Sequence, residues 1–308
     1  MKIVAMGSGG VGGYFGGRLQ QAGHEVTFIA RGRHLAALQS DGLRIKSAHG
    51  DAALKVRVLE NPAEAGPADV VLFAVKLWDT ETAAESLRPI IGPDTVVIPL
   101  QNGVESIERL RKILPEKSIM GGSAYIASRI GAPGVIEHTG TMVRLRFGVL
   151  MPSQRSAAQA FFAACRDAGI NPELAEDIVL VNWEKFVFLV GMSSAATLAR
   201  APLGVVRKDS DLRWLFEQAM RETWRLGRSR GVKLPDDFID KQLAFAETLP
   251  PEMRPSLLHD LEQGNRLEAP WLCGAVARMS TEAGLDAPVN RAVYAALKPY
   301  LQGARAQG

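Results

Sequence analysis

A short apolar strand that runs directly into a glycine-rich turn is the feature that most constrains the fold of this 308-residue chain. Residues 2–6, reading KIVAM, are typical of a buried parallel strand. Glycines follow at Gly7, Gly9 and Gly12, and the chain continues in a pattern that predicts a helix ending near Gly23. A G-x-G-x-x-G spacing between a strand and a helix predicts a dinucleotide-binding unit.

Each glycine of this turn has its own structural task. Gly7 allows the tight turn out of the strand, Gly9 lets a pyrophosphate approach the backbone, and Gly12 lets the helix pack closely against the strand. The unpaired N–H groups and the positive end of the helix dipole then hold the phosphates. The predicted cofactor-binding residues of this turn are Gly7, Ser8, Gly9, Gly10, Val11 and Gly12.

The loop after the second predicted strand, residues 25–29, indicates which dinucleotide is bound. A site that prefers NAD places Asp or Glu there for the ribose hydroxyls. This chain has Arg31 and Arg33 instead. A guanidinium is planar, always charged and able to bind a 2′-phosphate through two hydrogen bonds. Solvated loop charges are the alternative, but the upstream glycines favour NADP(H).

Two later strands each deliver a polar residue at their carboxyl ends. The apolar run 68–75 ends at Lys76, and the run 95–100 is followed by Gln101, Asn102 and Gly103. Open α/β sheets bind ligands at the carboxyl ends of their strands, so we expect Lys76 and Asn102 to lie near the cofactor. Either residue alone is equally compatible with ordinary turn chemistry.

The order of predicted elements defines the fold class. Strands and helices alternate up to about Ala175, which predicts an α/β, Rossmann-type doubly wound domain over residues 1–175. An appended β region is expected to include a hairpin within 134–148. Strand signals then vanish, and long helical patterns predict an all-helical domain over residues 176–308.

Composition excludes several classes of protein. The chain is 47% hydrophobic and 22% charged with a formal net charge of +3, which is typical of a globular protein. No basic block interleaved with aromatics indicates a nucleic-acid partner, and we recognised neither a membrane-spanning segment nor a signal peptide. We therefore expect a cytoplasmic protein. Cys165 and Cys273 lack metal-site spacing, so we expect reduced thiols in the core and no metal.

The first helix of the second domain contains a lysine on an apolar surface. Residues 182–198 are apolar nearly all round, and Lys185 shares one face with Phe188, Leu189 and Met192. A lysine in such a position must be paired, extend its amine outward to water, or face a cavity. From periodicity alone, a Lys185 side chain that extends its amine to water stays an alternative to a functional lysine.

These motifs together resemble the ketopantoate reductases (2-dehydropantoate 2-reductases) over essentially the whole chain. The resemblance rests on GSGGVG at 7–12, Arg31, AVK ending at Lys76, QNG at 101–103, the helix of Lys185, and the segment from Ser256 to Glu268. It implies an NADPH-dependent oxidoreductase that reduces a 2-keto acid to a 2-hydroxy acid. The leading substrate is ketopantoate, on the pantothenate route to coenzyme A.

The resemblance also implies a role for each matching residue. Lys185 matches the proton donor, and Glu268 matches the carboxylate that binds the substrate hydroxyl and helps hold the lysine. Ser256 matches a residue that contacts the substrate carboxylate. Asn102 matches one near the nicotinamide and the catalytic lysine, and Lys76 matches one at the cofactor side of the cleft. The purely structural alternatives are that Glu268 starts a helix and that Ser256 caps one.

Two positions depart from the family pattern. Leu189 and Ser193 stand where well-studied ketopantoate reductases carry asparagines that bind the substrate, and Leu267 replaces the usual threonine before Glu268. Ser193 stays a predicted substrate-binding residue, but Leu189 cannot form a hydrogen bond. A pocket without donors for a hydroxyl loses discrimination for it. A paralogue that reduces another keto acid or ketone is therefore an alternative.

Two further hypotheses stay open at this point. One is a dehydrogenase of the 3-hydroxy acid or 6-phosphogluconate group, against which the segment from Ser256 to Glu268 argues. The other is a non-catalytic NADP(H) sensor, against which Lys185 and Glu268 argue. The expected partner is a small-molecule keto acid, and a homodimer formed through the helical domain is a further expectation from the resemblance.

Overall fold

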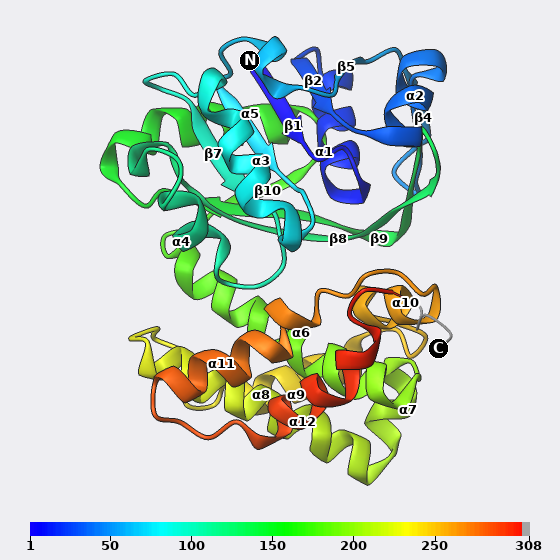
Figure 1. Ribbon diagram of the computed structural model, residues 1–308, viewed down its shortest axis with the longest axis vertical. Coiled ribbons are helices and arrows are strands. Elements are labelled where there is room, and N and C mark those ends of the chain that lie inside the picture. The colour runs from blue at the N-terminus through cyan, green and yellow to red at the C-terminus, as the bar shows by residue number, and fades with distance from the viewer. Residues whose placement is uncertain (304–308) are drawn as a thin grey trace. The chain divides into compact units, whose positions relative to one another are not determined.

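The chain folds into two compact units that divide between Val181 and Asn182. We describe residues 1–303 from a computed structural model (Figure 1). The division lies inside helix α6 (Ile178–Ala199), a few residues beyond the boundary expected from the change in sequence pattern.

The first unit is built on a five-stranded parallel sheet (Figure 1). Its strands lie in the order β5-β2-β1-β6-β7, and every neighbouring pair is parallel. This arrangement confirms the Rossmann-type domain. The strands are β1 (Lys2–Met6), β2 (Glu25–Ile29), β5 (Arg57–Leu59), β6 (Val70–Phe73) and β7 (Val96–Pro99).

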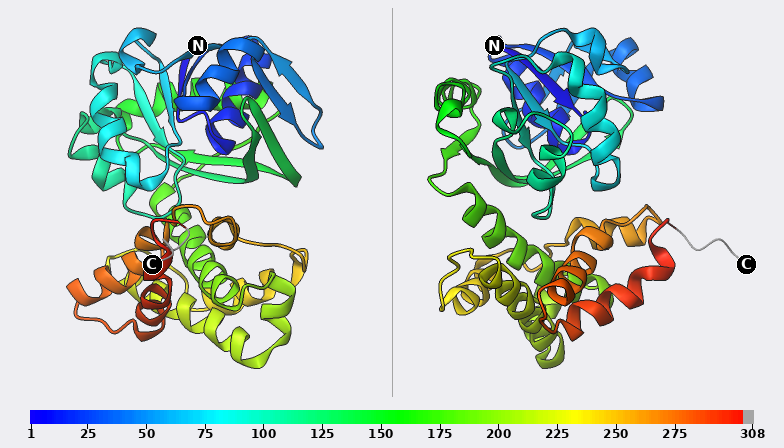
Figure 2. Two further views of the ribbon diagram at one scale, coloured as in Figure 1. Left: turned by 45° about the vertical axis from the view of Figure 1, so that its right-hand side comes forward. Right: turned by 60° about the vertical axis from the view of Figure 1, so that its left-hand side comes forward.

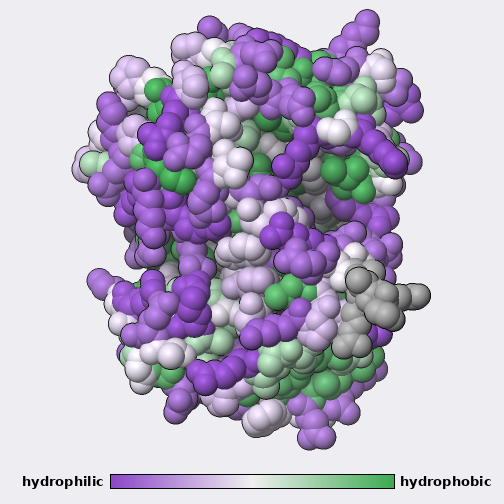
Figure 3. Space-filling model, in the orientation of Figure 1, coloured by the Kyte–Doolittle hydropathy of each residue, from purple (hydrophilic) through white to green (hydrophobic). Residues whose placement is uncertain are grey.

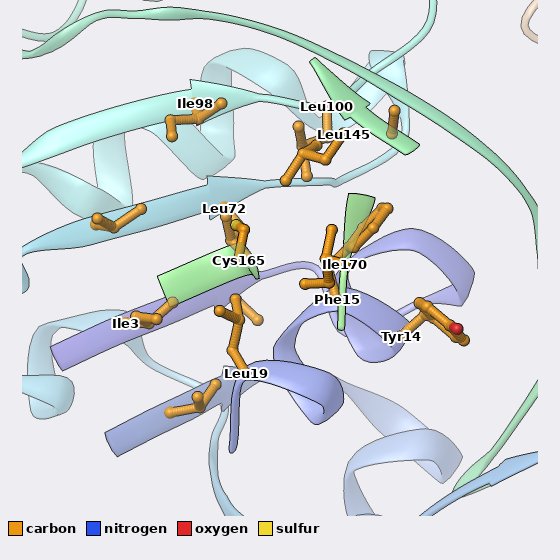
Figure 4. Packing of buried hydrophobic residues seen from close by; sticks show 14 of the residues in the cluster. Ile3, Tyr14, Phe15, Leu19, Leu72, Ile98, Leu100, Leu145, Cys165 and Ile170 are labelled. Atoms are coloured by element: carbon orange, nitrogen blue, oxygen red, sulfur yellow. The ribbon is translucent and has the colours of Figure 1, made fainter. Parts of the chain in front are cut away.

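Side chains that alternate along β1 enter two separate cores on the two faces of this sheet. Ile3 packs with α1 (Gly10–Gln21) and α5 (Arg155–Asp167), and Figure 4 shows this core with Phe15, Leu19 and Cys165. Val4 packs on the opposite face with α3 (Thr80–Leu87) and α4 (Ser106–Arg111). Helices therefore cover both faces, as a doubly wound sheet requires.

A second sheet packs against the far side of α1. Its strands run in the order β10-β9-β3-β4, and β8 pairs with β9. A Cβ on Gly13 would lie 2.9 Å from the Ile136 side chain of this sheet, whereas a Cβ on Gly16 would lie 2.8 Å from Phe28 of the parallel sheet. The strands are β3 (Leu43–Lys46), β4 (Ala52–Leu54), β8 (Gly121–Ala132), β9 (Val135–Gly148) and β10 (Asn171–Leu174).

The hairpin expected within residues 134–148 is wrong. Those residues form one strand, β9, whose antiparallel partner is β8. The turn lies at Gly134, which has a φ of +77°. The register of the β8–β9 pairing shifts between two pairs, Ile126 with Val143 and Ser128 with His138. Gly140, which has a φ of +74°, lies within the resulting bulge in β9.

The second unit confirms the expected all-helical domain, and both views of Figure 2 show only helices and loops there. Sequence patterns missed α7, a short helix between two longer ones. After α6, the α-helices are α7 (Leu203–Lys208), α8 (Ser210–Ser229), α9 (Phe238–Thr248), α10 (Ser256–Glu262), α11 (Cys273–Glu282) and α12 (Pro288–Leu297).

Helix α6 corrects the expectation that no segment is long and apolar enough to span a membrane. By length and composition alone, α6 could span a membrane, because it has 22 residues and contains an 18-residue window of mean hydropathy 1.4. That window is 61% buried inside the protein. The core helix of a globular protein passes the same test, so the length of α6 is weak evidence for a membrane segment.

Candidate active site

The loops that carry the predicted cofactor-side residues emerge at one edge of the parallel sheet. Met6 at the end of β1 pairs with the last residues of β2 and β6, and the last residue of β6 pairs with that of β7. Because parallel strands in register end together, the loops that follow them lie side by side. In spatial order these loops carry Arg31, Gly7, Lys76 and Asn102.

The glycine turn has the shape that a pyrophosphate requires. Gly7 has a φ of +93°, and a Cβ on Gly12 would lie 2.2 Å from the Gly7 carbonyl oxygen, so the helix packs tightly on the turn. A Cβ on Gly9 would meet no protein atom within 4 Å. No side chain among the described residues caps α1, which leaves its first N–H groups to a ligand. These features fit a dinucleotide.

Ser8, Gly10 and Val11 hold the turn in place. The buried Ser8 hydroxyl donates a hydrogen bond to the Ile29 carbonyl oxygen at 3.0 Å, which joins the ends of β1 and β2. A Cβ on Gly10 would lie 2.4 Å from the Ser128 carbonyl oxygen of β8. Val11 packs against the core next to the sheet. Packing and hydrogen bonding therefore account for the side-chain positions of these three residues.

His34 contributes to this edge, although no sequence pattern singled it out. It lies in α2 (Gly32–Asp41), and its Nδ1 accepts a hydrogen bond from the Gly134 N–H at 3.1 Å. Nε2 therefore carries the proton and donates to the Ser8 carbonyl oxygen at 2.8 Å. Burial lowers the pKa of His34, which favours this neutral form. The imidazole therefore links the glycine turn to the turn between β8 and β9 through two hydrogen bonds.

Arg31 has a charged partner that sequence analysis missed. Its guanidinium forms an ion pair with Asp79, the last residue of the 3₁₀ helix η2 (Leu77–Asp79) that follows β6. An acidic residue at the start of a helix is common, so the sequence offered no signal for this pairing. Lys76, one turn earlier, is exposed and lies over the Trp78 indole with 5.7 Å between its Nζ and the ring centroid.

The amide of Gln101 braces the loop that follows β6. Its Nε2 donates hydrogen bonds to the Val75 carbonyl oxygen and to the Thr80 hydroxyl, both at 2.9 Å. Asn102 is half-buried in the tight turn formed by Gly103, which has a φ of +86°. Within the QNG motif, Gln101 thus has a structural role, and Asn102 is the residue that stays a candidate ligand.

In the second unit, Lys185 and Glu268 interact electrostatically. Burial lowers the pKa of Lys185 to about 8, and the negative charge of Glu268 acts in the opposite direction. Glu268 is 7% exposed and precedes the 3₁₀ helix η6 (Ala269–Trp271). Lys185 is partly exposed, and its interaction with Glu268 argues against the alternative in which the side chain extends freely into water. The structure therefore brings together the two residues predicted to carry the chemistry.

The two predicted substrate-binding serines have different environments. Ser256 is exposed and is the first residue of α10, whose N-cap is Pro255. Ser256 therefore does not cap this helix, and Glu268 likewise makes no side-chain cap to η6. Ser193 is 1% exposed, and its hydroxyl has no hydrogen-bond partner within residues 1–303. This structure encloses Ser193, whereas Leu189 is partly exposed.

Comparisons with known proteins cover nearly the whole length of the chain. The family profile described as ketopantoate reductase PanE/ApbA matches residues 3–151, and its C-terminal counterpart matches residues 177–301. A 2-dehydropantoate 2-reductase of Nostoc sp. is 30% identical over all of this chain and 97% of that protein. An uncharacterized oxidoreductase of Bacillus subtilis, YkpB, is 29% identical over 97% of this chain and 99% of its own length.

A solved structure extends the comparison to three dimensions. The PanE/ApbA family ketopantoate reductase from Ralstonia eutropha has a TM-score of 0.88 and is 31% identical, with 98% of each chain covered. Fold and site together define an oxidoreductase that uses a nicotinamide cofactor. The chain belongs to the ketopantoate reductase family, which uses NADPH to reduce a small keto acid.

Proposed function

We propose that this protein uses NADPH to reduce a 2-keto acid to a 2-hydroxy acid, with ketopantoate as the leading substrate. The product would then be pantoate, on the route to pantothenate and coenzyme A. The observation that carries this proposal is the pairing of a desolvated Lys185 with the buried Glu268. Such a pair suits a reaction that places negative charge on a carbonyl oxygen and then protonates it.

NADPH supplies the hydride for the keto carbon of the substrate. Negative charge then develops on the carbonyl oxygen, where the Lys185 ammonium stabilises it and donates a proton to it. A pKa of about 8 keeps Lys185 protonated at pH 7 while making its proton easier to transfer than that of an ordinary lysine. We assign Glu268 the tasks of accepting a hydrogen bond from the substrate hydroxyl and of holding the ammonium.

The other proposed roles follow the positions of the residues. Backbone groups of residues 7–12 hold the pyrophosphate, Arg31 the 2′-phosphate, and Lys76 and Asn102 the part of the cofactor nearer the nicotinamide. Ser256 is exposed at the first turn of α10, where its hydroxyl is available to a substrate carboxylate. Ser193 is the weakest of the proposed ligands, because its enclosed hydroxyl must become accessible before it can bind a substrate.

The second candidate is reduction of a different keto acid or ketone, and Leu189 is the observation that favours it. Leu189 lies one helical turn after Lys185 and cannot hydrogen-bond the hydroxyl of ketopantoate. Trimethylpyruvate has the same carbon skeleton around the ketone without that hydroxyl. A pocket lined by leucine would discriminate little between the two, whereas a site built to bind the hydroxyl would strongly prefer ketopantoate.

We further propose that the protein works in the cytoplasm, and that it forms a homodimer through the helical unit. Large hydrophobic side chains on this unit are exposed, among them Val205, Trp214 and Phe245. Figure 3 shows a band of hydrophobic residues along the lower part of the viewed face, over the second unit. Exposed apolar surface of this kind supports an interface, which sedimentation of the purified protein would test.

A substrate panel with Lys185→Met tests the reaction. We expect the unaltered protein to oxidise NADPH with ketopantoate or trimethylpyruvate, and the variant to lose about 10²- to 10⁴-fold in kcat, which is the usual contribution of a proton donor. NADPH binding should persist. Lys233→Met, which removes an exposed lysine, is the control. Near-normal turnover of Lys185→Met would exclude the lysine as the acid, and no turnover of the unaltered protein with any keto acid would favour a sensor.

A further inference from the structure

We propose that Asp79 sets the cofactor preference of this protein by competing with the 2′-phosphate of NADPH for Arg31. This inference rests on the proposed phosphate-binding role of Arg31. Arg31 and Arg33 alone would give a strong preference for NADPH over NADH. Asp79 would make that preference weaker, which makes it a specificity-determining residue.

The ion pair connects the two loops on either side of the glycine turn. Arg31 follows β2, and Asp79 follows β6. The strand between β2 and β6 is β1, which ends at Met6 and is followed directly by Gly7 of the turn. A dinucleotide whose pyrophosphate lies on that turn therefore has its adenosine end beside one partner of the pair. A phosphate bound by Arg31 would therefore share the guanidinium with Asp79, whose Oδ2 contacts Nη2.

The two partners differ in how firmly they are held. The Arg31 side chain is 73% exposed, whereas that of Asp79 is 24% exposed. The Leu77 carbonyl oxygen in the loop of Asp79 accepts hydrogen bonds from the Arg109 guanidinium at 2.9 Å and from the Thr80 hydroxyl at 2.8 Å. The Asp79 N–H itself donates to the Lys76 carbonyl oxygen at 2.9 Å. The backbone that carries Asp79 is thus held in place, whereas most of the Arg31 side chain is exposed.

A carboxylate at this place acts differently on the two cofactors. The 2′-phosphate of NADPH carries a charge of about −1.5 to −2, so Asp79 both repels it and holds the guanidinium that would bind it. NADH has free ribose hydroxyls instead, and a carboxylate can accept hydrogen bonds from them. Arg33 is exposed and forms no ion pair within residues 1–303, so one cation stays available to the phosphate.

Replacing Asp79 with Asn tests this competition in the full-length protein. We expect Asp79→Asn to lower the Kd for NADPH by about twofold to fivefold at low ionic strength, within the range that exposed charge pairs give. The Kd for NADH should stay the same or rise. The gain should shrink at high salt, because the charges lie near the surface. Fluorescence of the reduced nicotinamide measures both Kd values without turnover.

Two controls separate this effect from general changes in charge. Glu85→Gln neutralises a carboxylate on the following helix, α3, where the partner is Arg88, and should leave the ratio of the two Kd values unchanged. In an Arg31→Ala background, Asp79→Asn should give a smaller gain in NADPH affinity, because only the direct repulsion between the carboxylate and the phosphate is then relieved. Circular dichroism confirms that each variant is folded, and Asp79 makes no side-chain cap to α3 that the substitution would remove.

Three outcomes would overturn the proposal. An unchanged Kd ratio in Asp79→Asn would mean that the carboxylate does not compete with the phosphate. A lower preference for NADPH would mean that Asp79 instead orients Arg31 for binding. Undiminished NADPH affinity in Arg31→Ala would remove the premise that Arg31 holds the phosphate, and that result concerns only the cofactor assignment, because keto acid reduction would persist.

Discussion

Lys185 is the residue whose charge state limits the proposed reaction, and its environment sets that charge. Burial lowers its pKa to about 8, and Glu268 opposes this shift. The acid form is needed for reduction and is lost as the pH rises through the pKa. We therefore expect kcat/KM for keto acid reduction to be level below pH 8 and to fall about tenfold per pH unit above it.

Glu268→Gln tests the cause of that limb of the pH profile. Removing the negative charge lets desolvation act unopposed, so the pKa of Lys185 should fall and the limb should move to lower pH by about one unit. Glu262→Gln, an exposed change in the same segment, should leave the limb in place. A limb that did not move in Glu268→Gln would show that the two residues are not coupled.

Gly9 and Gly12 make opposite demands on the fold, although they belong to one motif. A Cβ on Gly9 meets no protein atom within 4 Å, whereas one on Gly12 lies 2.2 Å from a backbone oxygen. Gly9→Ala should therefore keep the Tm of the cofactor-free protein and weaken NADPH binding tenfold or more, on the order of one lost hydrogen bond. Gly12→Ala should lower the Tm itself. Unimpaired NADPH binding by Gly9→Ala would argue against a pyrophosphate at this turn.

At the scale of elements, one buried carboxylate fixes the position of the last long helix. Glu222 of α8 is 3% exposed and accepts three hydrogen bonds at 2.8 Å, from the backbone N–H groups of Val289 and Asn290 and from the Asn290 amide. It thus satisfies the N-terminus of α12, which no side chain of its own caps. The negative charge also suits the helix dipole.

Glu222→Ala should destabilise the protein by about 3 kcal/mol, because three buried donors lose their acceptor. The midpoint of urea unfolding measures this loss. Glu217→Gln on the same helix removes only a partly exposed pair with Arg221 and should change stability by less than about 0.5 kcal/mol. Equal effects of the two variants would show that the buried cap contributes no more than a surface pair.

At the scale of the whole molecule, the division into two units predicts that they open separately. Each unit contains one buried free cysteine, Cys165 in the first and Cys273 in the second. Burial raises the pKa of both thiols, that of Cys273 to about 12, so neither reacts while its unit is folded. The rate of alkylation therefore reports the opening of each unit.

The proposed phosphate ligands all belong to the first unit, so NADPH should protect the two cysteines unequally. At a concentration about 100 times its Kd, it should slow alkylation of Cys165 by about 100-fold and that of Cys273 much less. Mass spectrometry of the labelled peptides distinguishes the two sites. Equal slowing at both would mean that the units unfold as one.

The sequence by itself determined the two-domain fold class, the glycine turn and the elements that carry Lys76, Asn102 and Lys185. Local patterns suffice there, because a buried strand, a tight turn and an apolar helix each have a periodicity or spacing of their own. The β8–β9 pairing, the short α7 and the length of α6 escaped these patterns. A bulge at Gly140 imitates a turn until the partner strand is known.

Only the tertiary structure decided which charged and polar groups face one another. The pairs Arg31 with Asp79 and Lys185 with Glu268 join residues far apart in the chain, as does the contact of Glu222 with α12. Burial and distance control these interactions, and neither is a property of a local stretch of sequence. The sequence therefore determined the class of cofactor and reaction. The fold decided the environment that sets the charge of Lys185, and it placed Asp79 beside Arg31 at the proposed phosphate site.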